Sequence, residues 1–86
     1  MSHYDELRNH IASMGSLIRG LPRGHINMAG ERLTSALAAV NSGNPDPSRV
    51  ASKLSDVADM IADHHGSEHP DSVRAASIVN AIQGLK

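Results

Sequence analysis

The fold is decided by residues 46–65, DPSRVASKLSDVADMIADHH, where a helix start, a helical period and a helix stop agree. Asp46 can accept a hydrogen bond from the free N–H groups of a new helix, and Pro47 has the preset φ of a first helical residue. Gly66 follows the stretch and can adopt the positive φ that closes a helix. These signals predict a helix that begins at Pro47 and ends at His65.

The apolar residues of this stretch recur at steps of four, three and four. They are Val50, Leu54, Val57 and Ile61. Because an α-helix turns by about 100° per residue, this spacing places all four on one face, so the helix has one buried stripe. The spacing excludes a strand, whose apolar residues would alternate with polar ones.

Residues 2–19 have a second helical pattern. The apolar residues lie at steps of three, four, three and four: Tyr4, Leu7, Ile11, Met14 and Ile18. Ser2 is the expected N-cap, and Asp5 and Glu6 lie in the first turn, where the helix dipole favours negative charge. Gly15 lies on the polar side, where its lack of a side chain allows another element to approach closely.

A further helix is expected to begin near His25 or Asn27 and to end at Asn41, after a turn at residues 20–24 that contains two glycines and one proline. One face of this helix is apolar and rich in alanine: Ile26, Ala29, Leu33, Ala36, Leu37 and Val40. Small side chains let a neighbouring helix approach closely, so this face is a good central packing surface.

The last helix is expected from Pro70 to about Leu85, because Pro70 and Asp71 suit a first helical turn. The buried face of this helix is Ala75, Ile78, Val79 and Ile82. Loops of a few residues imply antiparallel neighbours. The sequence therefore predicts one all-α domain over residues 1–86, a small antiparallel bundle of four short helices. Three helices with a frayed C-terminal helix are the alternative.

Eighty-six residues without Phe, Trp or Cys can build only a small aliphatic core. We therefore expect marginal stability of the monomer and a homodimer or higher homo-oligomer. The net charge is −1, and Lys and Arg are scattered rather than clustered, so binding to nucleic acid is not expected. Because there is no apolar run of roughly 20 residues and the N-terminal MSHYDELRNH lacks a signal-peptide core, we expect a cytoplasmic protein that does not bind membranes.

The concentrated charge of the protein is acidic. Asp56, Asp59 and Asp63 share the flank of the helix at 47–65 that lies away from its buried stripe. Neighbouring like charges repel by roughly a few tenths of a kcal/mol per pair, and a cationic partner relieves this repulsion. We interpret the three aspartates as a binding surface for a basic face of another protein. A plain solvated face is the alternative.

A second candidate site is basic. Arg19, Arg23 and His25 lie on or beside the turn at residues 20–24, and Arg32 follows further along the next helix. Basic side chains ahead of a helix with free N–H groups are the ingredients of an anion site, so binding of a nucleotide or phosphate is a second hypothesis. The motif GxxxxGK[ST] is absent, so no phosphate-binding fold is implied, and an ordinary helix end and turn is the alternative.

Histidines and carboxylates are concentrated in residues 63–71, DHHGSEHPD. Imidazole and carboxylate groups bind divalent metals, so His64, His65 and His69 form a third hypothesis, a metal site. Adjacent histidines on a helix point about 100° apart, which disfavours a shared metal. In the alternative, His64 and His65 are placed at the negative end of the helix dipole.

Size, composition and surface charge together predict a non-enzymatic helical module for protein–protein interaction. Such a module serves as an adaptor, an antitoxin-like partner, or a phage- or plasmid-encoded regulator that inhibits a larger protein. No nucleophile, base and orienting group can be placed together from the sequence, so we predict no enzyme and no cofactor.

Overall fold

The computed structural model describes residues 3–43 and 46–85, apart from the side chains of His3 and Tyr4. This part of the chain forms four α-helices: α1 (His3–Leu17), α2 (Arg23–Asn41), α3 (Pro47–His65) and α4 (Pro70–Gln83). A short 3-10 helix, η1 (Ile18–Gly20), follows α1. The predicted all-α bundle of four short helices is confirmed, and α4 is a regular helix.

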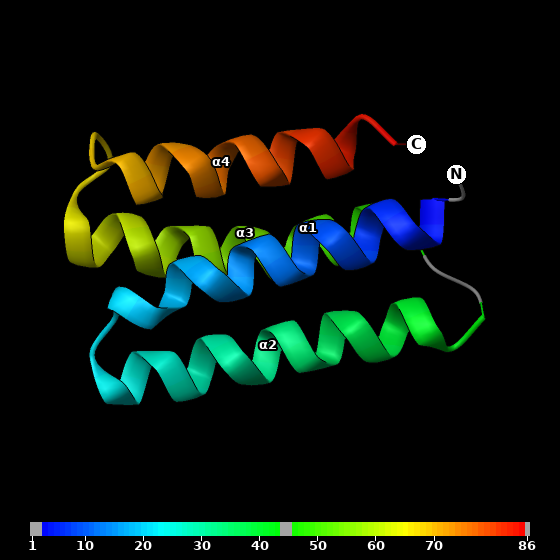
Figure 1. The fold of residues 1–86 in the computed structure, drawn as a ribbon, viewed down its shortest axis with the longest axis horizontal. Helices are drawn as coiled ribbons and strands as arrows, with labels where there is room; N and C mark the ends of the chain where they lie inside the picture. The colour runs from blue at the N-terminus through cyan, green and yellow to red at the C-terminus, as the bar shows by residue number, and fades with distance from the viewer. Residues whose placement is uncertain (1–2, 44–45, 86) are drawn as a thin grey trace.

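The α1–α2 and α3–α4 connections lie at one end of the molecule, and the α2–α3 connection lies at the other end (Figure 1). In this view α1 and α3 lie between α2 and α4, and α3 makes its most extensive contacts with α4 and then with α2. The molecule measures 33 × 22 × 17 Å. The helix with the strongest sequence signals therefore makes the two most extensive helix–helix contacts of the described bundle.

The core is aliphatic, and all four helices contribute to it. Its largest fully buried side chains are Leu7, Met14, Val40, Val50, Leu54, Val57, Ile61 and Ile82. The predicted stripe of α3 is thus completely buried, and each aliphatic side chain of this kind stabilises the fold by roughly 1.5–3 kcal/mol. The predicted face of α4 is buried as well.

Small residues contribute to the buried faces of α3 and α4. Ala51 and Ala75 are buried, and Ala58 is packed against the core. Ser72 is also buried, at the start of α4. Side chains that extend little beyond Cβ let helices approach closely, and the α3–α4 contact is the most extensive in the described bundle.

Both ends of α3 are closed as predicted. Oδ1 of Asp46 accepts a hydrogen bond from the Ser48 amide at 3.0 Å, and Pro47 is the first helical residue. Gly66 has a φ of 91°, and its amide donates to the Ala62 carbonyl at 2.8 Å. Local side-chain and backbone chemistry therefore sets the start and the end of α3.

The start of α2 differs from the prediction. The helix begins at Arg23 rather than near His25 or Asn27. Pro22 is the N-cap, and its carbonyl accepts from the Ile26 amide at 2.9 Å. Proline has a φ that suits a helix entrance, so α2 begins directly after the residue that was expected only to break the preceding helix.

The end of α1 also differs. α1 ends at Leu17, two residues before the expected end at Arg19, because the chain tightens into η1, where the Leu21 amide donates to the Ile18 carbonyl at 3.0 Å. Tightening into a 3-10 turn is common at helix ends. The predicted N-cap Ser2 lies outside the described residues.

Two predicted helix faces need correction. Leu37 was expected in the core but is 37% exposed, because it lies at the edge of the stripe formed by the buried residues of α2. Gly15 was expected on the polar side but is half-buried and faces α2: a Cβ on Gly15 would lie 3.8 Å from Cδ1 of Leu33. The close approach expected at Gly15 is thus with α2.

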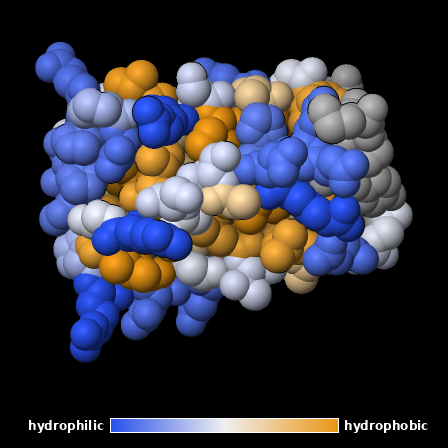
Figure 2. Space-filling model, viewed as in Figure 1, coloured by the Kyte–Doolittle hydropathy of each residue, from blue (hydrophilic) through white to orange (hydrophobic). Residues whose placement is uncertain are grey.

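The surface carries large apolar side chains at only three described positions, Met28, Leu37 and Val73. On the face seen in Figure 2, hydrophobic and hydrophilic residues are interspersed. None of the described helices combines the length and the apolar character needed to cross a membrane.

Replacing Asp46 by Ala removes the acceptor of the α3 N-cap and leaves Pro47 in place. The free energy of unfolding should fall by about 1 kcal/mol, the usual effect of losing such a cap. Asp46→Asn keeps an acceptor oxygen and should cost much less. Urea unfolding followed by circular dichroism measures both changes, and equal losses in the two variants would contradict the cap.

Gly30→Ala should raise the free energy of unfolding by about 1 kcal/mol, because Gly30 lies inside α2 and a Cβ there meets nothing within 4 Å. Gly20→Ala is the matched contrast. Gly20 lies in η1, and its Cβ would lie 3.3 Å from Nε2 of His65, so this variant should gain nothing. Thermal and urea unfolding compare the stabilities of the two variants. An equal gain in stability at Gly20 and Gly30 would show that the contact of the Gly20 Cβ with His65 is unimportant.

Candidate interaction surface

Three aspartates form the outer face of α3. Asp56, Asp59 and Asp63 are all exposed, and they lie about one helical turn apart on the side opposite the buried stripe. We call these three residues the acidic ridge. The same helical period that buries Leu54 and Ile61 directs the three carboxylates to solvent.

The first residue of the acidic ridge is tied to α2. Nη1 of Arg32 lies 3.4 Å from Oδ2 of Asp56, and the two side chains are 43% and 55% exposed. Water screens an ion pair at this exposure, so the pair contributes at most about 1 kcal/mol to stability. Asp59 and Asp63 form no ion pair with any described residue. Two neighbouring carboxylates of the ridge thus have no cation partner within residues 3–43 and 46–85.

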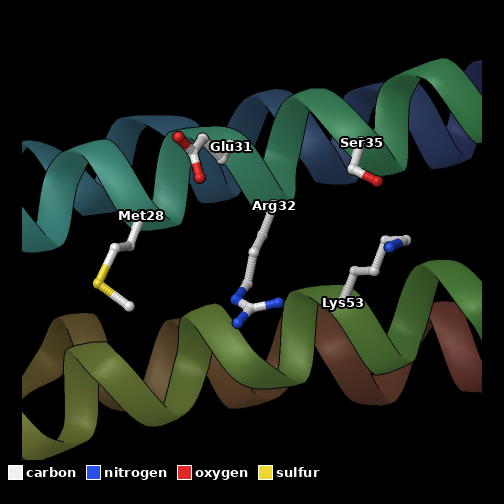
Figure 3. A pocket seen from close by; sticks show the side chains of 5 residues that line it. All are labelled: Met28, Glu31, Arg32, Ser35 and Lys53. Atoms are coloured by element: carbon white, nitrogen blue, oxygen red, sulfur yellow. The ribbon is translucent and has the colours of Figure 1, made fainter.

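An open pocket lies beside the acidic ridge, between α2 and α3. It is lined by Met28, Glu31, Arg32, Ser35 and Lys53. Met28 and Arg32 reach from α2 toward α3, and Lys53 extends from α3 toward α2 (Figure 3). Because Arg32 lines the pocket and also pairs with Asp56, the pocket and the ridge form one continuous surface.

The structure separates Arg32 from the other three basic residues that were predicted to bind an anion. Arg19 lies on η1, Arg23 is the first residue of α2, and His25 follows in its first turn. All three are exposed. Arg32 lies about 14 Å further along α2 and is directed toward Asp56. Three of the four residues therefore remain together at the α1–α2 turn, whereas Arg32 belongs to the surface of the acidic ridge.

The three histidines predicted as metal ligands gather at the α3–α4 turn. The ring centroids of His64 and His65 are 4.6 Å apart, and those of His65 and His69 are 4.3 Å apart. The His65 and His69 rings are stacked, with 20° between their planes. In the described part of the chain, no group of three His, Cys, Asp or Glu residues could hold a metal ion. The geometry thus gives the metal hypothesis no support.

His69 is instead the N-cap of α4. Its Nδ1 accepts a hydrogen bond from the Asp71 amide at 3.1 Å. The Gly66 carbonyl accepts from the Ser72 hydroxyl at 2.7 Å and from the His69 amide at 3.2 Å, so the turn is closed by three hydrogen bonds. Sequence reasoning did not find this cap, although a residue directly before Pro70, the first helical residue, occupies the N-cap position.

Sequence reasoning also did not find the Arg32–Asp56 ion pair or the pocket beside it. The two residues lie on different helices, far apart in the chain. The helical period shows which face of a helix is polar, but it does not show which other helix lies next to that face. No local signal could have found the pair.

The fold and this surface define a small all-α bundle with an acidic outer helix face. Comparison of the chain with protein-family models, curated proteins and solved structures finds no match. Function is therefore inferred from the surface itself.

The Arg32–Asp56 pair should be weak and sensitive to salt. A double-mutant cycle with Arg32→Ala and Asp56→Ala should give a coupling energy of roughly 0.2–1 kcal/mol, because both side chains remain accessible to water. The coupling should shrink as ionic strength rises. Urea unfolding at low and high NaCl measures it, and a coupling that does not change with salt would contradict an exposed pair.

Proposed function

We propose that this chain is a non-enzymatic helical module that binds a basic surface of another protein through the acidic ridge. The observation that supports this function is the exposure of three carboxylates on successive turns of α3, of which Asp59 and Asp63 have no cation partner among the described residues. Lysines or arginines of a partner would relieve the repulsion between these neighbouring carboxylates.

The core supports this function by holding the acidic ridge in place. Leu54 and Ile61, on the opposite face of α3, have no exposed area. The ridge residues therefore stand on a helix whose position is determined by packing. A surface that is already ordered loses less conformational entropy on binding than a flexible segment does.

The neighbouring pocket affects where the basic groups of a partner would bind on this surface. The wall carries two cationic side chains, Arg32 and Lys53, against one carboxylate, Glu31, so a cation is less favoured there than at Asp59 and Asp63. Met28 is half exposed at the same pocket and offers an apolar contact beside the charged ones. The surface therefore favours a partner that has basic residues next to an apolar group.

A small anionic ligand at Arg19, Arg23 and His25 is the weaker alternative. Its support is reduced because Arg32 lies on the other surface and already faces Asp56. An adaptor, an antitoxin-like partner and an inhibitor of a larger protein are each compatible with an acidic surface that binds a basic one. Self-association into a homodimer or higher homo-oligomer stays a prediction, as does the cytoplasmic location.

Charge reversal tests the proposed function. A variant that combines Asp59→Lys with Asp63→Lys should lose proteins that the wild type captures from a cell lysate, because the partner's basic groups would then be repelled. The control combines Asp5→Lys with Glu68→Lys, which changes net charge equally at exposed positions outside the ridge. Quantitative mass spectrometry compares the captured proteins, and circular dichroism checks that each variant is folded.

The expected result is at least one protein that the wild type and the control capture equally and that the ridge variant loses at least tenfold. Capture of this protein should weaken at high salt, because exposed charges are screened. If the ridge variant captures the same proteins as the wild type, the proposed function is wrong.

A further inference from the structure

The outer face of α3 is divided by charge along its length. Arg49 and Lys53 lie toward its N-terminus, and the acidic ridge occupies its middle and C-terminal part. Arg49 is exposed, and Lys53 is half-buried at the pocket beside the ridge. Neither basic residue forms an ion pair with any described residue. One side of α3 therefore presents cations without partners as well as carboxylates without partners.

The charges are arranged symmetrically about Asp56. Arg49 lies seven residues before Asp56, and Asp63 lies seven residues after it. Seven residues are nearly two helical turns, so these three side chains lie almost in one line, with about 10 Å between neighbours. Lys53 lies three residues before Asp56, and Asp59 lies three residues after it. Each basic residue is thus matched by a carboxylate at the same distance on the other side of Asp56.

This arrangement makes the face complementary to itself in the antiparallel direction. When a second copy of α3 lies antiparallel on the first, with the two-fold axis at Asp56, Arg49 of each copy is level with Asp63 of the other. Lys53 of each copy is level with Asp59 of the other. Lys53 extends toward α2 (Figure 3), and its flexible four-carbon stem lets the ammonium turn toward the second copy. A parallel pairing in register would bring like charges together, which is unfavourable.

The Arg32–Asp56 ion pair offsets the repulsion at the centre of the antiparallel pairing. At the two-fold axis, Asp56 of one copy faces Asp56 of the other, and the two carboxylates repel each other. Nη1 of Arg32 lies 3.4 Å from Oδ2 of Asp56 in the same chain, so each of these carboxylates has its own cation. The ridge residue that would meet its own copy is thus the one that the fold already neutralises. The two that would meet cations, Asp59 and Asp63, are left without a cation partner among the described residues.

We propose that the outer face of α3 is a homodimer interface, in which the acidic ridge of each copy binds Arg49 and Lys53 of the other. The inference rests on the proposed function in taking the ridge as a surface that binds cations, and it names a second copy of the chain as an occupant. Because the homodimer covers the ridge, a different basic protein competes with the second copy for Asp59 and Asp63.

Exchange of charges between two variants tests the interface. One variant combines Arg49→Glu with Lys53→Glu, and the other is the ridge variant, Asp59→Lys with Asp63→Lys. Alone, each variant brings like charges together across the interface, so its homodimer should dissociate at least about tenfold more readily than that of the wild type. In an equimolar mixture every facing pair again has opposite charges, so the two variants should form a heterodimer.

Sedimentation equilibrium at low and high NaCl gives the masses of the wild type, each variant and the mixture, and circular dichroism checks that each is folded. At chain concentrations up to about 1 mM, which detect even a weak pair, the wild type should approach twice the mass of the chain. This mass should fall as salt rises, because exposed charges are screened. The control variant, Asp5→Lys with Glu68→Lys, has its changes outside α3 and should dimerise as the wild type does.

The inference is overturned if the wild type remains a monomer throughout this range, a result that needs no variant. It is equally overturned if the two charge variants dimerise as tightly as the wild type, or if two folded variants form no heterodimer on mixing.

The same variants separate the failure of this inference from the failure of the proposed function. The variant with Arg49→Glu and Lys53→Glu keeps the acidic ridge, so it should still capture the protein that the wild type captures from a lysate. If the wild type is a monomer while the ridge variant loses that protein, only the homodimer is wrong. If the wild type dimerises as described while the ridge variant captures the same proteins as the wild type, the binding of another protein is wrong and the homodimer stands.

Discussion

The packing of the bundle relies on the buried stripe of α3. Val50, Leu54, Val57 and Ile61 have no exposed area, and α3 packs against both α4 and α2. A chain without Phe or Trp has only aliphatic side chains and Met to fill its core, so the helices must approach closely to leave no voids. Alanines on α2, α3 and α4 provide that approach. A larger side chain on any of these contacts would separate helices that share one small core.

The same stripe determines the chemistry of the surface. With one face of α3 fully buried, a helix of about 3.6 residues per turn has no freedom to turn its aspartates inward, so the acidic ridge must face solvent. Burial of an unpaired carboxylate would cost several kcal/mol, which adds to the same preference. The position of the ridge is therefore a consequence of the core. Its lack of cation partners is a separate property, because Arg32 is placed to neutralise only Asp56.

Some features that depend on neighbours in the chain could be predicted from the sequence, although the His69 cap and the start of α2 were missed. Contacts that depend on how neighbouring helices are placed could not be predicted. Asp46 and Gly66 bound α3 through local hydrogen bonds and backbone conformation, so their roles follow from residue type and position. The predicted burial of Leu37 was wrong, because periodicity does not show how wide the covered stripe of a helix is. The contact of Arg32 with Asp56 depends on the relative rotation of α2 and α3, which side-chain packing sets and the helical period does not.

The acidic ridge lies on α3 and the histidine-capped turn follows it, but the end of α3 and the start of α4 are held by different hydrogen bonds. α3 is closed by Gly66, whose positive φ and hydrogen bond to Ala62 involve no titratable group. α4 begins after His69, whose Nδ1 accepts a hydrogen bond from the Asp71 amide. Loss of the second bond removes the cap of α4 but leaves the end of α3 intact. The position of Asp63, on the last turns of α3, therefore depends on the packing and the Gly66 end of α3 rather than on the His69 cap.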